Sequence, residues 1–221
     1  MGKHRYRKTE RGSLPVSALA GICLTVFWFT LAVVLVLNAR WLYELDISWL
    51  GLERASGMSA SDIRANYHAL IDYNQLLFRG PLMFPTLPMS QEGAIHFREV
   101  KRIFDLIQIA CPVSGLMSLL LGIRQRRQGR RAHFTIAGIL SIAIPVLLGI
   151  LVAADWERFF TGFHRLVFRN DYWLFDPATD PVILILPDTY FLQCAALILL
   201  IVLAGAALFL FLGRRRAGER A

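Results

Sequence analysis

The sequence predicts an all-α integral membrane protein: four transmembrane helices, with an extracytoplasmic cap formed by two loops that contain short helices. Two observations lead to this fold class. First, 56% of the 221 residues are hydrophobic and 18% are charged, whereas a soluble domain usually carries about 25% charged residues. Second, the excess apolar residues fall into four segments, each long enough for the roughly 20 residues that a helix needs to cross the hydrocarbon core.

The four segments predict spans at about 14–38, 103–123, 132–154 and 189–213. The first, third and fourth segments are free of Lys, Arg, Asp and Glu between residues 14–37, 132–154 and 189–213, and the second contains only Asp105. Pro112 and Pro145 interrupt the second and third spans, which a spanning helix tolerates. We therefore expect a single membrane domain over residues 1–221, with external loops at 39–102 and 155–188.

The basic residues predict the orientation of these spans. They gather before the first span, between the second and third, and after the fourth. The three clusters are Lys3, Arg5, Arg7, Lys8 and Arg11; Arg124, Arg126, Arg127, Arg130 and Arg131; and Arg214, Arg215, Arg216 and Arg220. In a four-span topology all three lie on one side, which the positive-inside rule makes cytoplasmic. The net charge of +8 is thus explained by topology, and no nucleic-acid partner is expected. Residues 1–13 predict a disordered basic tail.

The first external loop is expected to hold a helix and an irregular apolar stretch. Trp41 and Tyr43 predict an interfacial belt at the end of the first span. Ser59 and Asp62 have the spacing of a capping box, and apolar residues continue at helical spacing to Leu77, over roughly four turns.

Glycine and proline residues at positions 80, 81, 85 and 88 then break the chain. The apolar residues that follow suit a loop at the lipid interface or over a cleft; they are Leu82, Met83, Phe84, Leu87 and Met89. Residues 92–104 predict a helix that leads into the second span and carries His96.

The second external loop contains the most distinctive stretch of the chain, FHRLVFRNDYWLFDPATDPVILILPDTYF, from Phe163 to Phe191. A helical continuation of the third span is expected to carry His164. Asp176-Pro177 and Asp180-Pro181 are turn signals, and residues 182–186 predict a small strand or a buried extended stretch. Polar groups held against a bilayer are costly, which makes this stretch a candidate site.

Two of the five histidines are the candidate catalytic residues. His96 and His164 each lie within one or two turns of a span on the outer side, next to phenylalanine. Imidazole changes charge near neutral pH and suits general acid–base catalysis. The alternative is that both are interfacial histidines with satisfied hydrogen bonds. His4, His68 and His133 are expected to have no special role.

Other kinds of catalytic site find no support in the sequence. The three cysteines, Cys23, Cys111 and Cys194, lie inside spans, so the outer loops offer neither a disulfide nor a thiol nucleophile. There is no GxSxG elbow, P-loop or dinucleotide-binding glycine motif. The loops also lack HxxxH, HxH and CxxC spacings, which disfavours a metal site.

The sequence resembles the lipoprotein intramolecular transacylase family of small four-span bacterial membrane proteins. The motifs that carry the resemblance are Tyr73-Asn74, His96-Phe97, Val100-Lys101, Phe104 and the stretch from Phe163 to Phe191. Three positions depart conservatively from the expected pattern: Glu99 where Asp is expected, Phe175 where Leu is expected, and Asp188 where Glu is expected. These departures bear on acyl or head-group preference and leave the general function in place.

The resemblance implies the reaction and the partners. The enzyme would move the sn-2 acyl chain of a diacylglyceryl-modified bacterial lipoprotein to the α-amine of its N-terminal cysteine, leaving an N-acyl lyso-form product. Donor and acceptor belong to one molecule, so no cofactor or nucleotide is expected. The protein would lie in the bacterial cytoplasmic membrane among membrane lipids, with both termini cytoplasmic and the active site at the outer face.

The chemistry of that reaction suggests a role for each candidate residue. We assign His164 as the base and His96 as its partner, with Asp171 orienting an imidazole and Asn170 or Lys101 stabilising the oxyanion. The remaining candidates for substrate binding are Tyr73, Asn74, Trp173 and Asp176. For Asp176, as for Asp180, formation of a turn is the simpler role; Trp173 suits an interfacial anchor as well as a substrate contact.

Two other classes of function remain open at this point. The first is a non-catalytic membrane factor that binds a lipid or a partner protein, which would need the shape of the cap but not both histidines. The second is a metal-dependent membrane hydrolase, which would be sensitive to chelators.

Overall fold

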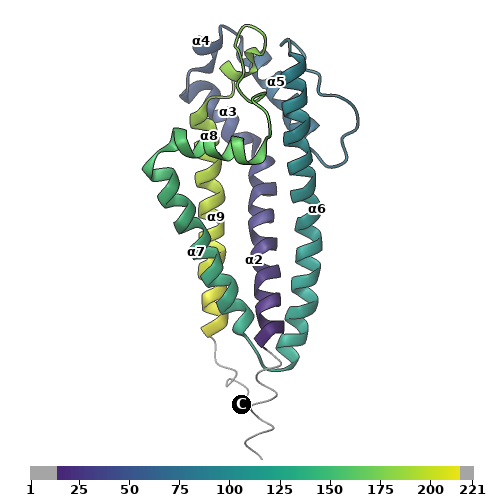
Figure 1. Ribbon diagram of the computed structural model, residues 1–221, viewed down its shortest axis with the longest axis vertical. Coiled ribbons are helices and arrows are strands. Elements are labelled where there is room, and N and C mark those ends of the chain that lie inside the picture. The colour runs from purple at the N-terminus through teal and green to yellow at the C-terminus, as the bar shows by residue number, and fades with distance from the viewer. Residues whose placement is uncertain (1–13, 215–221) are drawn as a thin grey trace, which may run out of the picture. The chain divides into compact units, whose positions relative to one another are not determined.

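The structure is a computed structural model that describes residues 14–214. Regular structure within this range is entirely helical (Figure 1). The basic residues expected in the N-terminal tail, and those that follow Arg214, lie outside the described residues. The helices are α2 (Leu14–Leu37), α3 (Arg40–Trp49), α4 (Leu52–Ser56), α5 (Ala60–Tyr73), α6 (Gln91–Arg127), α7 (Ala132–Ala154), α8 (Trp156–Val167), the 3-10 helix η1 (Pro181–Leu184) and α9 (Asp188–Arg214).

Four of these helices, α2, α6, α7 and α9, are long and apolar enough to cross a membrane. They coincide with the four predicted spans and confirm the fold class of a multi-pass all-α membrane protein. The helix of the second span begins twelve residues before the predicted apolar segment, at Gln91, because the predicted amphipathic stretch and the span form one continuous helix, α6.

The described chain divides into two compact units. One comprises residues 14–33, 109–150 and 198–214, and the other comprises residues 34–108 and 151–197. The expected organisation as a single domain stays a prediction. In the first unit, the Trp28 indole donates a hydrogen bond to the Ile201 carbonyl (3.0 Å). Gly205 lies against this indole, where a Cβ atom would overlap the ring; small residues allow such close approach between membrane helices.

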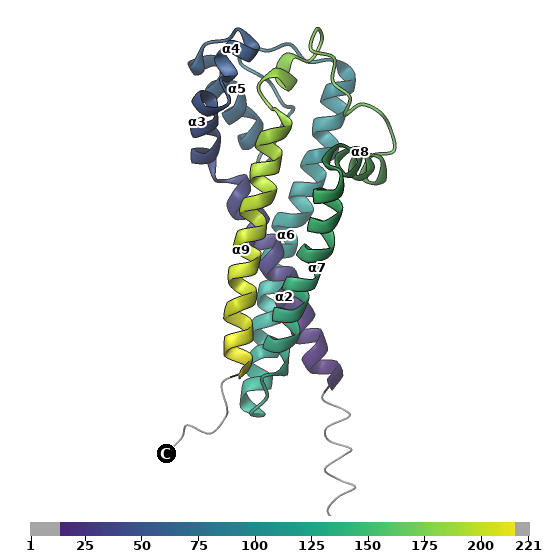
Figure 2. The same cartoon turned by 90° about the vertical axis from the view of Figure 1, so that its left-hand side faces the viewer.

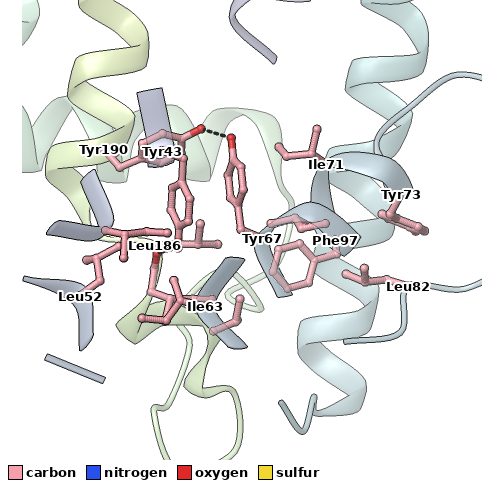
Figure 3. Close-up of a cluster of buried hydrophobic side chains, with 14 of the residues drawn as sticks. Tyr43, Leu52, Ile63, Tyr67, Ile71, Tyr73, Leu82, Phe97, Leu186 and Tyr190 are labelled. Carbon is pink, nitrogen blue, oxygen red and sulfur yellow. Dashed lines mark hydrogen bonds between the residues drawn. The ribbon is translucent and has the colours of Figure 1, made fainter. Parts of the chain in front are cut away.

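The second unit is organised around buried tyrosines. The rings of Tyr43 and Tyr67 stack with centroids 3.6 Å apart. The Tyr67 and Tyr190 hydroxyls share a hydrogen bond of 2.8 Å (Figure 3), and the Tyr43 hydroxyl donates to the Ile185 carbonyl at 2.6 Å. The prediction of an interfacial belt is therefore wrong for Tyr43, which is fully buried in this core, whereas Trp41 is exposed.

The first external loop is more helical than expected. Helices α3 and α4 were not predicted. Helix α5 begins as expected at the Ser59 cap, whose hydroxyl accepts from the Asp62 amide. It ends at Tyr73 rather than near Leu77, because the amide and the side chain of Asn74 both donate to the Leu70 carbonyl and close the helix.

Much of the irregular apolar stretch packs inward. Leu82 is buried, and Phe84, Leu87 and Met89 pack against the tyrosine core. Only Met83 of the five apolar residues is largely exposed. The stretch is therefore held on the core of its own unit, with Leu82 and Met89 lining a cavity, and contact with the lipid interface stays a prediction for the exposed Met83.

Two predictions about the second external loop need correction. Helix α8 does not continue α7: the chain is extended at Asp155, whose carboxylate accepts a hydrogen bond from the Arg158 amide and caps a new helix, α8 (Figures 1 and 2). Residues 181–184 form the 3-10 helix η1 instead of a strand. Pro181 at its first position has the φ that a helical start requires.

Candidate active site

His96 is positioned by the first turns of α6. The Ser90 hydroxyl caps this helix by accepting from the Gly93 amide (2.9 Å), and the Ser90 amide in turn donates to the buried Asp180 carboxylate (2.8 Å). Phe97, next to His96, is buried in the core of the same unit. The rotation of α6 is thereby fixed, and His96 lies buried, with 6% of its surface exposed.

His164 lies near the end of α8, and a backbone contact determines its tautomer. Its Nδ1 atom is 2.8 Å from the Phe160 carbonyl, one helical turn earlier. A carbonyl oxygen only accepts, so Nδ1 carries the proton in the neutral ring. The Nε2 atom of His164 therefore has a free lone pair, which is the form that a general base requires.

The structure brings the two histidines together. Their ring centroids are 6.2 Å apart, and aromatic rings enclose both. The ring centroids of Phe168 and Phe175 lie 4.7 and 5.4 Å from that of His96. Those of Phe160 and Trp173 lie 4.1 and 4.8 Å from that of His164. We call these six residues the two-histidine cluster. It joins α6, α8 and the loop that follows α8.

Both imidazoles are biased toward the neutral form. Burial is the main cause, and it lowers the pKa of His96 to about 4, with a smaller contribution from His164. Burial also lowers the pKa of His164, opposed by its bond to the Phe160 carbonyl and by the charge of Asp188. At neutral pH both rings are therefore unprotonated and able to accept a proton.

Two polar atoms in the cluster have no hydrogen-bond partner within the described chain. They are Nδ1 of His96 and Nε1 of Trp173, and both are buried. Unpaired buried polar atoms are costly in a folded protein, and each calls for an explanation such as an ordered water, an ion or a catalytic role. Nδ1 of His96 and Nε1 of Trp173 are thus the buried polar atoms of the cluster that remain without a partner.

Asn170 and Asp171 differ sharply in their surroundings. The Asn170 amide nitrogen donates to both carboxylate oxygens of Glu99 (3.1 and 3.2 Å), and its oxygen accepts from the Tyr172 amide. Asp171 is exposed, and within the described residues its carboxylate makes no hydrogen bond or ion pair. The Phe160 carbonyl, not Asp171, therefore orients His164. Glu99 was not among the predicted site residues; its position on α6, three residues after His96, was the available signal.

Asp176 and Asp180 have structural roles. The Asp176 side chain accepts from the Ala178 amide (2.9 Å), and its carbonyl accepts from the amides of Thr179 and Asp180. This is the pattern of an aspartate-initiated turn. Asp180 is 3% exposed and accepts from the Ser90 amide and the Thr179 hydroxyl.

The other predicted residues gather on a different side of α6. Tyr73 and Lys101 line a cavity of about 490 Å³ that does not include either histidine. The Lys101 ammonium lies 5.5 Å from the centre of the Tyr73 ring and bonds to Asp105 and the Gln75 carbonyl, both at 3.0 Å. The Asn74 side chain caps α5, and its buried oxygen has no partner.

Metal ligands do not cluster in the part of the chain that the structure describes. No three His, Cys, Asp or Glu side chains between residues 14 and 214 are grouped as a metal centre would require. The site is therefore best described as a pair of neutral imidazoles in an aromatic enclosure.

Known proteins show the same fold and sequence pattern. The family model "Lipoprotein intramolecular transacylase Lit" matches residues 18–191. The solved structure of the membrane integral lipoprotein intramolecular transacylase Lit from Bacillus cereus is 34% identical, with a TM-score of 0.89, over 93% of this chain and 95% of that one.

Structures of two variants of the same Bacillus cereus protein are also similar. In one, a histidine is replaced by arginine; the identity is 32% and the TM-score 0.87, over 97% of this chain and 96% of that one. In the other, the same histidine is replaced by alanine; the identity is 33% and the TM-score 0.86, over 96% of each chain. A search of curated proteins finds no match.

Proposed function

The chain belongs to the lipoprotein intramolecular transacylase family, and we propose that its two-histidine cluster performs the proton transfers of the family reaction. The protein is an acyltransferase of the membrane. It transfers the sn-2 acyl chain of a diacylglyceryl-modified lipoprotein to the α-amine of the N-terminal cysteine, and the product is an N-acyl lyso-form lipoprotein. The observation that carries the assignment is the 6.2 Å separation of the two enclosed imidazole rings.

The first step requires a base. The α-amine of the substrate has a pKa of about 8 and must lose a proton before its lone pair can attack the ester carbonyl. His164 is the base, because the bond from Nδ1 to the Phe160 carbonyl leaves the lone pair on Nε2. Its lowered pKa keeps that lone pair free of a proton at neutral pH.

The second step requires a proton for the leaving group. Attack of the nitrogen on the ester carbon forms the C–N bond and leaves a negative charge on the carbonyl oxygen and a positive charge on the nitrogen. The nitrogen then gives up a second proton to the histidine pair, after the first has passed to solvent. When this intermediate collapses, the C–O bond to the glycerol breaks and the glycerol oxygen takes up a proton. His96 relays this proton, since its neutral ring lies beside His164, and its low pKa makes its protonated form a strong acid.

The oxyanion is stabilised by Trp173. Asn170 was a candidate for this role, but its amide is engaged with Glu99. Lys101, the other candidate, is bonded to Asp105 and Gln75 in the cavity on another side of α6. The Trp173 Nε1 group is a buried donor without a partner, and its ring lies 4.8 Å from that of His164. A donor fixed in position stabilises developing charge most effectively in a dry site.

Several features suit a substrate that is itself a lipid-anchored protein. Amine and ester lie on one molecule, so holding them together supplies an effective concentration that reaches about 10⁵ M or more in oriented systems. The aromatic rings around the two histidines would limit the access of water, which would otherwise hydrolyse the ester. We place the site at the outer face of the cytoplasmic membrane with both termini in the cytoplasm, on the basis of the basic clusters.

The test is expression of the full chain in a bacterium that lacks lipoprotein N-acylation, with mass spectrometry of a reporter lipoprotein. Wild type should give the N-acyl lyso form. His96→Ala and His164→Ala should each reduce the product by about 10²–10⁴, the contribution of a general acid–base group. The matched control is His68→Ala, since His68 lies outside the cluster and pairs with Glu44 at 3.3 Å.

The same assay separates the alternatives. Full activity of either cluster variant, at an equal amount of membrane-inserted protein, would contradict the two-histidine mechanism. Activity in both would favour a non-catalytic lipid- or partner-binding role for the cluster. In a purified reaction, EDTA should leave the product yield unchanged, and loss of product would instead indicate a metal-dependent hydrolase.

A further inference from the structure

A cationic cavity lies on the side of α6 away from the two-histidine cluster. Its volume is about 490 Å³, and all its lining residues belong to the second unit. Helical spacing places Ala94, Arg98, Lys101, Arg102 and Asp105 on one side of α6. Arg79, Tyr73, Phe78, Leu82 and Met89 supply much of the remaining lining. Neither histidine contributes to it, so the cavity is separate from the acid–base residues.

The charges of the cavity do not balance. It contains four cations and one carboxylate, that of Asp105, which is bonded to Lys101. Arg79 donates to the carbonyls of Leu76 and Phe78. Arg98 and Arg102 make no hydrogen bond or ion pair with any other described residue. Two guanidinium groups therefore remain available to a ligand, and the planar guanidinium fork matches the oxygens of a phosphate.

The position of these cations along the chain is unusual for a membrane protein. Arg98, Lys101 and Arg102 directly precede the apolar segment 103–123, at the end of the span that we place outside. The positive-inside rule concentrates such residues on the opposite side. Basic side chains at the end of a span often extend toward lipid headgroups; here they border a cavity, which would hold a headgroup in place.

The other lining residues make the cavity amphipathic. Tyr73, Phe78 and Leu82 give it apolar walls. The chain segments beside the cavity expose two large apolar side chains, Leu77 at 81% and Met83 at 74%. Exposed apolar residues next to a basic patch are the pattern of a surface that inserts into the acyl region and contacts anionic headgroups.

We propose that this cavity binds the phosphodiester headgroup of an anionic membrane phospholipid. Arg98 and Arg102 bind the phosphate oxygens, and the apolar walls contact the glycerol and the first acyl carbons. The bound lipid is distinct from the substrate of the proposed reaction, because a diacylglyceryl thioether carries no phosphate. It would hold this part of the protein, and α6 with it, at a fixed depth in the leaflet.

The experiment measures lipid binding to the full-length protein in detergent by native mass spectrometry. The probes are dioleoylphosphatidylglycerol, dioleoylglycerol with the same chains but no phosphate, and inorganic phosphate as a competitor. The test variant is the double change Arg98→Gln and Arg102→Gln. The control is Arg54→Gln with Arg165→Gln, which removes two exposed outer charges that do not line the cavity.

Wild type and control should bind dioleoylphosphatidylglycerol equally. The test variant should bind it roughly 30-fold more weakly, since each basic side chain beside an anionic lipid contributes on the order of fivefold in affinity. Binding of dioleoylglycerol should be the same for the test and control variants, because this lipid has no phosphate. Competition by millimolar phosphate would show that the phosphate group alone is sufficient for binding to the cavity. A lack of competition would show that binding requires the whole lipid. Both results support the site.

Equal lipid binding by the test and control variants would overturn the proposal. So would tighter, arginine-dependent binding of an acidic peptide from the mature region of a lipoprotein, which would identify the cavity as a peptide site. Melting curves of both double variants verify that each is folded. Binding is measured without turnover, so failure here would leave the assignment of the two histidines intact.

Discussion

The reactivity of the two histidines depends on which atoms their ring nitrogens contact. Helix α8 supplies its own orienting group: the Phe160 carbonyl accepts from Nδ1 of His164 one turn later. No separate carboxylate is needed to fix the tautomer. Nδ1 of His96 has no partner in the described chain, and the low pKa of this ring comes mainly from burial, with a smaller contribution from His164. The two rings are thus chemically unequal, although the sequence context of each, a histidine beside phenylalanine, looks similar.

Burial of His96 predicts a pH-dependent stability. His96 lies outside the apolar segment 103–123. The pKa of its side chain is about 6.5 in the unfolded chain and about 4 in the folded protein. Between these values the unfolded state binds more protons, so the free energy of unfolding decreases as pH falls. From pH 7.5 to pH 5 the loss is about 2 kcal/mol, at 1.36 kcal/mol for each pKa unit. Thermal unfolding of the full chain in detergent measures it.

The control for this measurement is His96→Phe. Phenylalanine fills a similar volume among Phe168 and Phe175 but cannot take up a proton. The melting temperature of this variant should fall less than that of wild type between pH 7.5 and pH 5. An identical decrease in the two proteins would mean that other groups, such as His164, account for the acid sensitivity.

Asn170 and Asp171 offer a second test at the scale of single residues. Asn170→Ala removes both hydrogen bonds to Glu99 and the bond from the Tyr172 amide. Loss of such a network should destabilise the protein by about 1–3 kcal/mol and reduce N-acyl product, because the loop that carries Trp173 would be released from α6. Asp171→Ala should remain within about twofold of wild type, since an exposed side chain without partners contributes little. A larger loss of N-acyl product in the Asp171→Ala variant would restore the assignment of Asp171 as the residue that orients an imidazole.

The sequence predicted the side chains that cluster in the candidate site better than the groups that hold them there. His96, His164 and Trp173 were candidates, and the structure brings all three together. Glu99 was noticed only as a departure from the family pattern. Its bond to Asn170 joins positions 71 residues apart, and no periodicity along the chain reveals a contact of that range. Backbone acceptors such as the Phe160 carbonyl are likewise invisible in a sequence, because every residue has one.

At the scale of helices, the tyrosine core connects elements that are distant in the sequence. The buried Tyr43 hydroxyl on α3 donates to the carbonyl of Ile185, which follows η1. Tyr43→Phe leaves that buried carbonyl without this donor, a loss of about 1–3 kcal/mol. The melting temperature should fall by roughly 2–4 °C for each kcal/mol. Tyr172→Phe is the matched control because Tyr172 is exposed and its hydroxyl makes no bond within the described residues. Equal melting temperatures would mean that water replaces the Tyr43 donor.

The elements that the sequence predicted well are those with one dominant signal. The four spans are long and strongly apolar, and that single signal identifies them. Helix α5 was found through its capping box, and α6 through its amphipathic spacing. By contrast, α3 and α4 are short, and the first was interpreted as an interfacial belt because of Trp41 and Tyr43. Residues 182–186 are too short to span and were expected to form a small strand or a buried extended stretch, but a strand needs a neighbouring strand, and the described chain has none.

At the scale of the whole molecule, charge rather than packing sets the orientation. Of the 16 acidic residues, only Glu10 and Glu219 lie on the side that we predict to be cytoplasmic, together with the three basic clusters. The four cations of the outer cavity are among the ten basic residues that lie outside these clusters. Three of them lie on a helix whose opposite end carries Arg124, Arg126 and Arg127, and the orientation predicted here follows from the larger number of charges on that side.

The orientation can be tested on the full chain with three single cysteines introduced at exposed positions: Arg54→Cys, Gln128→Cys and Ala178→Cys. A membrane-impermeant maleimide added to intact cells without an outer membrane should label positions 54 and 178. Position 128 should react only after lysis, because the arginine cluster around it holds that turn in the cytoplasm. Wild type, whose cysteines lie in the spans, gives the background, and reporter fusions after Arg54, Gln128 and Pro177 should agree. Labelling of Gln128→Cys in intact cells would reverse the orientation and place both histidines on the side of the membrane away from the lipid-anchored amine.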